Sequence, residues 1–231
     1  MKRYLLLAFL ALFIVCSVEL AASTCYGTTS NGALRNGCKL PGSGPNFSPY
    51  TSLGSALGRT WVHCDVAQVV SDAYAALSES HPDWRFVYAE SGKAKGGEFE
   101  PHKTHQNGLS VDFMVPVLDT SGTSVPLPTS ILNKFGYSIE FDSSGHVGDL
   151  RIDFEAIAAH LAAVREAANA NDVGIWRVIF DPELQPRLQS TTSWRKIKDL
   201  QFSERRSWVR HDEHYHIDFD IRCRSLADLP E

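Results

Sequence analysis

Residues 214–221 alternate strictly between apolar and polar side chains. The odd positions carry Tyr215, Ile217, Phe219 and Ile221, and the even positions carry His214, His216, Asp218 and Asp220. Because successive side chains of a β-strand point to opposite faces, this period of two predicts a strand. Its apolar face must pack on a core, so the opposite face presents two imidazoles that can converge on one point.

Residues 109–117 show the same alternation, with Asp112 on the polar side. The apolar side consists of Leu109, Val111, Phe113, Val115 and Val117. Asn107-Gly108, just before this segment, is a turn signal, and a turn there would fold His105 back beside Asp112. If the two predicted strands are neighbours, their polar faces bring four side chains together: His105, Asp112, His214 and His216.

Such a patch predicts a catalytic metal site. Five of the nine histidines fall within 102–105 and 211–216, and three protein ligands with one open position are typical of catalytic zinc. The candidate ligands are His105, Asp112 and His216. The alternative is that His214 and His216 are surface histidines on an edge strand. The remaining four histidines are assigned to surface or core positions: His63, His81, His146 and His160.

The residues around these ligands suggest candidate proton carriers. No H-E-x-x-H motif occurs, so a glutamate base on a helix is not expected, and Glu213 would point away from His214 if the strand began that early. His211 breaks the alternation and is expected to precede the strand as a wall of the site or a second proton carrier. Three carboxylates are candidates for orienting the imidazoles: Asp212, Asp218 and Asp220.

The rest of the chain reads as one α+β domain over residues 24–231. Residues 24–60 are rich in Gly, Ser, Thr, Asn and Pro and are interpreted as an ordered arm over the core, whereas turn residues punctuate 118–150. Helical periodicity predicts helices at 64–78 and 152–169, with two short helices near Pro182 and after Ser193. Strands are predicted at 85–90 and 174–180.

Residues 1–23 have the pattern of a cleaved export signal. Lys2 and Arg3 precede an apolar run over 4–18, which is shorter than the roughly 20 residues needed to span a bilayer, and small residues follow. Removal of this segment leaves 20 of the 22 basic and 26 of the 27 acidic residues, a net charge of −6. This acidic balance argues against nucleic acid as a partner, and no membrane anchor is expected after cleavage.

Four cysteines remain in the mature chain, and an even number in an exported protein suggests two disulfides. Three pairings are possible, of which Cys25–Cys223 with Cys38–Cys64 is favoured. A zinc site built from cysteines is not favoured because no C-x-x-C pair exists.

Several stretches resemble the penicillin-insensitive murein endopeptidases. The resemblance is carried by Gly96-Gly97 and by residues 101–112 and 211–216, and in the arm by 25–32 and 40–48. These enzymes belong to a group of zinc peptidases that includes lysostaphin, the D-Ala-D-Ala metallopeptidases and the hedgehog signalling domain. The resemblance covers most of the mature chain in patches but does not extend clearly over 118–200.

The resemblance implies a fold, a cofactor and a substrate. It implies a central antiparallel sheet flanked by helices and a Zn²⁺ ion bound by His105, Asp112 and His216. It also implies catalytic roles next to the metal for His214, with His211 and His102 lining the site. The expected enzyme is a periplasmic metallo-endopeptidase that cleaves peptide cross-links of bacterial peptidoglycan, at D-alanyl–meso-diaminopimelyl bonds.

Three other interpretations remain open at this point. The same fold could serve a zinc D,D-carboxypeptidase or an L-Ala-D-Glu endopeptidase, and it could also serve a non-catalytic cell-wall-binding module that retains the metal. A secreted structural protein without a metal is the third. The sequence does not define the oligomeric state.

Overall fold

The computed structural model describes residues 22–207 and 209–230. Most of the predicted export signal, residues 1–21, lies outside this range. No helix among the described residues is long and apolar enough to cross a bilayer.

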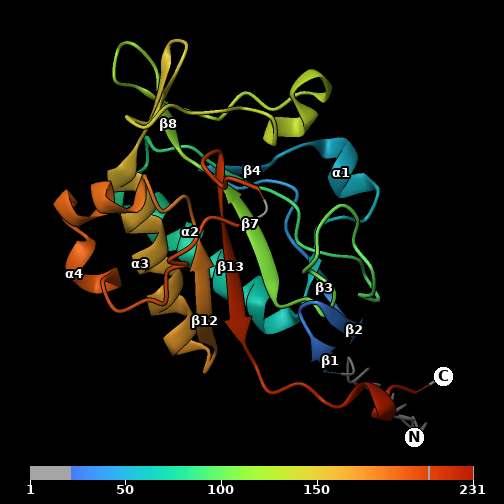
Figure 1. The fold of residues 1–231 in the computed structure, drawn as a ribbon. Coiled ribbons are helices and arrows are strands. Elements are labelled where there is room, and N and C mark those ends of the chain that lie inside the picture. The colour runs from blue at the N-terminus through green and yellow to red at the C-terminus, as the bar shows by residue number, and fades with distance from the viewer. Residues whose placement is uncertain (1–21, 208, 231) are drawn as a thin grey trace, which may run out of the picture.

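A five-stranded sheet forms the centre of the structure (Figure 1). Its strands run in the order β12-β13-β7-β6-β4 and are antiparallel except for the parallel pair β4 and β6. Their bounds are Gly174–Ile179, His214–Asp220, Ser110–Met114, Phe86–Tyr88 and Phe47–Pro49. The antiparallel sheet expected from the resemblance is therefore present, and β13 and β7 are neighbours.

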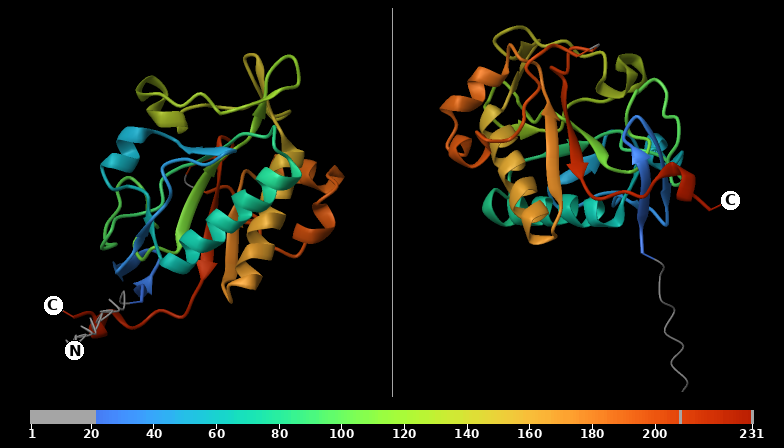
Figure 2. Two further views of the ribbon diagram at one scale, coloured as in Figure 1. Left: turned by 180° about the vertical axis from the view of Figure 1, so that it is seen from behind. Right: turned by 60° about the horizontal axis from the view of Figure 1, so that its bottom comes forward.

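Two long helices, α2 (Cys64–Ser80) and α3 (Phe154–Ala170), cover one face of this sheet (Figure 2, left). The apolar residues of β13 face them, since the Tyr215 hydroxyl hydrogen-bonds to Nδ1 of His160 on α3 at 2.8 Å. The predicted helix at 152–169 begins two residues later because the Asp153 side chain caps it by accepting from the backbone N–H of Ala156.

The strand predicted over 109–117 is divided between two sheets. β7 ends at Met114, and β8 (Val117–Leu118) joins a second, antiparallel sheet with β9 (Ser124–Val125), β10 (His146–Val147) and β11 (Leu150–Ile152). Pro116 lies between β7 and β8 and lacks the backbone N–H that a continuous strand would use. The turn-rich stretch 118–150 thus forms two hairpins joined by the short 3₁₀ helix η1 (Ile131–Gly136).

The N-terminal arm is ordered, as expected, and the chain forms five short strands and a helix before α2. The strands β1 and β2 pair with each other, as do β3 and β5, and β4 joins the central sheet. The bounds are Thr24–Thr28 for β1, Asn31–Arg35 for β2, Cys38–Lys39 for β3, Trp61–Val62 for β5 and Ser52–Ala56 for α1.

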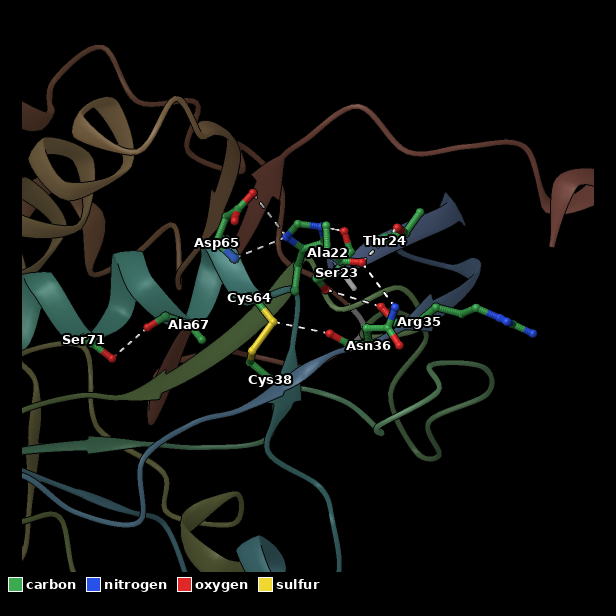
Figure 3. Close-up of a disulfide and its surroundings, with 11 residues drawn as sticks. Ala22, Ser23, Thr24, Arg35, Asn36, Cys38, Cys64, Asp65, Ala67 and Ser71 are labelled. Atoms are coloured by element: carbon green, nitrogen blue, oxygen red, sulfur yellow. Dashed lines mark hydrogen bonds and ion pairs between the residues drawn. A yellow bond between two sulfur atoms is a disulfide. The ribbon is translucent and has the colours of Figure 1, made fainter. Parts of the chain in front are cut away.

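Two disulfides anchor the arm. Cys25 is bonded to Cys223, just beyond the end of β13, and Cys38 is bonded to Cys64, the first residue of α2 (Figure 3). This is the pairing favoured from the sequence. Short helical segments complete the chain at Gln185–Ser190 (η2), Trp194–Ile197 (α4) and Leu226–Asp228 (η3).

Candidate metal centre

Asp112 and His216 face each other directly across strands β7 and β13. Oδ1 of Asp112 lies 2.8 Å from Nδ1 of His216, and both side chains are buried. They project from the face opposite the helices because the odd-numbered residues of β13 fill the core. The period-two pattern therefore predicted both the strand and the side from which these groups project.

His105 reaches the same carboxylate from the loop before β7. Its Nε2 lies 3.3 Å from Oδ1 of Asp112, and its backbone adopts a left-handed conformation with φ of 69°. The predicted turn is present, with the Asn107 side chain accepting from the backbone N–H of Leu109 and Gly108 at φ of 79°. This turn folds His105 back beside Asp112, as expected.

The protonation of His105 makes this place suitable for a cation. Its Nδ1 lies 3.2 Å from the carbonyl oxygen of Ser91 and must donate a proton to it. Burial lowers the pKa of His105, so the ring is neutral and Nε2 carries a lone pair. This Nε2 is fully buried without a hydrogen bond, and it faces the Asp112 carboxylate. A metal ion between the two lone-pair donors would satisfy both.

The geometry presents two options for the third ligand. Ligand atoms of His102, His105 and Asp112 lie within 4.8 Å of one another. From the sequence, His102 is instead expected among the catalytic residues and His216 as the third ligand. His216 is close to the same carboxylate, but both of its nitrogens are in hydrogen bonds, to Asp112 and to Asp218.

Asp218 orients the His216 ring. Its Oδ1 accepts from Nε2 of His216 at 2.8 Å and from the Ser110 hydroxyl at 2.5 Å, and its Oδ2 accepts from Nε of Arg177 at 2.6 Å. Burial favours neutral His216, but the carboxylates of Asp218 and Asp112 outweigh it and raise the pKa of His216 to about 10. Of the three carboxylates considered as orienting groups, Asp218 has this contact, whereas Asp220 is exposed.

Asp212 has a different role. Its Oδ2 accepts from the backbone N–H of Phe141 and from Nη1 of Arg210 at 3.3 Å. It therefore joins the segment before β13 to the turn-rich region.

His214 and Glu213 form a buried pair beside Asp112. Nδ1 of His214 lies 2.8 Å from Oε1 of Glu213, and its Nε2 lies 3.8 Å from Oδ2 of Asp112. Burial lowers the pKa of His214, but the charges of Glu213 and Asp112 outweigh this effect and raise it. This contact of Glu213 is not expected from the sequence, because a strand that began before His214 would point Glu213 away from it. The strand begins at His214, so the residue before it is free to turn back to the imidazole.

His211 lies before β13, as predicted, with a left-handed φ of 58°. Its ring centre is 4.6 Å from that of His214, and its Nδ1 hydrogen-bonds to the carbonyl oxygen of Val209 at 3.0 Å. Burial and the neighbouring imidazole of His214 lower the pKa of His211 to about 4. A neutral imidazole therefore lines the site at physiological pH.

Glu90, at the end of β6, holds His102 in place and was not identified from the sequence. Nε2 of His102 donates to Oε2 of Glu90 at 2.6 Å, which leaves Nδ1 turned towards Oδ2 of Asp112 at 3.7 Å. Arg59 binds both oxygens of Glu90, and the Tyr50 hydroxyl donates to Oε1 at 3.0 Å. The sequence signal available was a carboxylate at the end of a predicted strand.

Tyr137 connects the turn-rich region to the site and was also missed. Its hydroxyl donates to Oδ2 of Asp112 at 2.9 Å and accepts from the backbone N–H of Glu90 at 3.2 Å. A single buried carboxylate, Asp112, is thus surrounded by four imidazoles and a phenol. The imidazoles near Asp112 are those of His102, His105, His214 and His216.

A cavity of about 610 Å³ opens onto this group. Its volume suits a peptide-sized ligand, and its apolar walls alternate with charged groups. Besides the residues described above, it is lined by Pro101, Lys103, Thr104, Lys134, Phe135, Ile179 and Ser207.

Comparison with known proteins yields one family. A sequence model of that family, described as penicillin-insensitive murein endopeptidase, matches residues 25–227. The matched range contains all six histidine and aspartate residues that were predicted to form the site, and it includes 118–200, where the motifs alone gave no clear resemblance. A search among curated proteins found no match.

Proposed function

This chain belongs to the penicillin-insensitive murein endopeptidase family, and on that premise we propose that it is a zinc-dependent hydrolase of peptidoglycan cross-links. The bond proposed is the one between D-alanine and meso-diaminopimelate. The observation that best supports a metal is the unpaired, buried Nε2 of His105 facing the Asp112 carboxylate.

The proposed metal ligands are His105, Asp112 and His216. Support for His216 comes from its position opposite Asp112 and from Asp218, which binds the outer nitrogen of the ring as partners of metal-bound histidines usually do. His102 is the competing third ligand. A zinc ion at this position would supply Lewis-acid chemistry, lowering the pKa of water and polarising the scissile carbonyl.

His214 is the proposed general base. Because Nδ1 of His214 donates to Glu213, its Nε2 is left on the side of Asp112, where it can accept a proton. The buried carboxylate of Glu213 stabilises the imidazolium that results. The neutral ring of His211, whose centre lies 4.6 Å from that of His214, bounds the same side of the cavity. Its Nδ1 donates to the carbonyl oxygen of Val209, so its Nε2 is left as a hydrogen-bond acceptor.

The site of action is proposed to be the periplasm. Two disulfides fit an oxidising compartment, and the substrate implied by the family lies outside the cytoplasm.

Digestion of purified cross-linked muropeptide dimers tests the proposal. The mature protein should convert dimers to monomers, lose this activity with a chelator and regain it with zinc. Mass spectrometry of the products identifies the bond, and release of terminal D-alanine alone would instead indicate a carboxypeptidase. One bound zinc per chain without any cleavage would favour the wall-binding alternative.

Two sets of variants test the residue roles. His214→Ala should retain zinc and lose most turnover, whereas His105→Ala and Asp112→Ala should lose both. Comparing zinc content in His216→Ala and His102→Ala identifies the third ligand. Hydrolysis by metal-depleted His214→Ala protein would refute the scheme.

A further inference from the structure

The cavity contains a lysine that the proposed chemistry does not use. Lys134, in η1, lines the cavity and is exposed to solvent. Among residues 22–207 and 209–230 it has no ion pair, unlike Arg59 with Glu90 and Arg177 with Asp218.

The carboxylates of the cavity wall are already neutralised. Glu90 binds Arg59 and His102, and Glu213 binds His214. Asp112 is surrounded by imidazoles and is a proposed metal ligand. The Lys134 ammonium therefore adds positive charge to the cavity of a protein whose overall charge is negative.

The backbone holds Lys134 in an unusual conformation. Lys134 and Phe135 are consecutive non-glycine residues with left-handed φ values of 51° and 59°, a region that L-residues adopt only at an energetic cost. Such conformations persist where the surroundings enforce them and are concentrated at functional sites.

Specific contacts enforce this conformation. The Asn133 side chain accepts from the backbone N–H groups of Ser130 and Gly136 at 2.8 and 2.9 Å. Phe135 packs edge-on against Tyr50, with ring centres 6.0 Å apart. Three residues after Lys134, Tyr137 binds Asp112, so the segment is fixed relative to the metal centre.

We infer that Lys134 binds a free carboxylate of the peptide substrate close to the scissile bond. This inference rests on the proposed function and makes it more specific. In a D-alanyl–meso-diaminopimelyl cross-link, the carbon that bears the leaving nitrogen also carries a carboxylate, so the substrate has an anion within a few atoms of the reacting carbonyl. Recognition of this group distinguishes a substrate with a free carboxylate from its amidated counterpart.

The test measures kcat and KM with two synthetic cross-linked peptides that differ only by a carboxylate or a primary amide at that carbon. Wild-type protein should show a KM about fivefold to tenfold lower for the carboxylate substrate, as expected for one partly exposed, charge-assisted contact. Lys134→Met should raise the KM for the carboxylate substrate to that of the amide, with little change in kcat. Lys134→Arg should preserve most of the preference.

Lys198→Met is the matched control, because Lys198 is exposed at the end of α4, outside the cavity lining, and its substitution removes the same charge. It should behave as wild type. Equal KM values of the wild type for the two substrates, or a Lys134→Met variant that keeps the preference, would overturn the inference while leaving the endopeptidase intact. A wild-type protein that cleaves neither peptide nor muropeptide dimers would refute the proposed function itself.

Discussion

The Glu90 carboxylate should stabilise the fold in a pH-dependent manner. Burial alone would raise the pKa of Glu90, but hydrogen bonds from His102 and Arg59 outweigh it and lower the pKa from 4.5 to about 2. The folded protein therefore binds this proton more weakly than the unfolded chain does. The resulting stabilisation is complete above the unfolded pKa and is lost as the pH falls from about 4.5 towards 2.

The size of this contribution follows from the two pKa values. Their difference corresponds to about 3 kcal/mol in the free energy of unfolding at pH 7, of which about 1.4 kcal/mol remains at pH 3. Glu90→Gln removes the titrating group. The stability difference between wild type and this variant should thus shrink by about 2 kcal/mol between pH 7 and pH 3.

Urea unfolding of the metal-free proteins at the two pH values measures this quantity. Other carboxylates titrate in both proteins, so their effects cancel in the difference. Glu79→Gln is the control, because Glu79 is exposed on α2. This substitution should leave the free energy of unfolding nearly unchanged at both pH values. If the free energies of unfolding of wild type and Glu90→Gln differ by the same amount at pH 7 and pH 3, the pH-dependent stabilisation by Glu90 is refuted.

Three further changes probe the site and the scaffold. Asp218→Asn should lower zinc affinity about 10-fold to 100-fold in a competition assay with a chromophoric chelator, and unchanged affinity would contradict ligation by His216. Glu213→Ala should leave zinc content unchanged and lower kcat about 10-fold to 100-fold because His214 loses its orienting partner; wild-type kcat would exclude that role. Cys64→Ser opens a disulfide loop with a sequence separation of 26 and should lower the free energy of unfolding by about 3.5 kcal/mol, measured by urea titration, whereas a loss below about 1 kcal/mol would contradict this.

The sequence predicted those features that depend on local periodicity. The period of two in 214–221 identified β13 and the side on which its histidines lie, and helical spacing identified α2 and α3. The turn at Asn107-Gly108 placed His105 beside Asp112. These features were accessible because each is determined by residues within a short stretch of chain.

The parts of the site that could not be predicted from the sequence depend on contacts between distant segments. Glu90 reaches His102 only because β6 pairs with β7, and Tyr137 arrives from a region whose turns show no periodicity. The choice between His102 and His216 as third ligand depends on how their rings are rotated, which Glu90 and Asp218 determine. No pattern along the chain carries that information.

The position of β13 has a consequence for the order in which the protein becomes active. This strand lies between β12 and β7 although it comes last among the strands of the described residues, and its His216 hydrogen-bonds to Asp112, which lies 104 residues earlier in the chain. A chain in which β13 has not yet been added contains His105 and Asp112, but its central sheet is open and it lacks His216, the third of the proposed ligands. With His216 as the proposed third ligand, insertion of β13 between β12 and β7 completes the central sheet and the proposed metal site in one step.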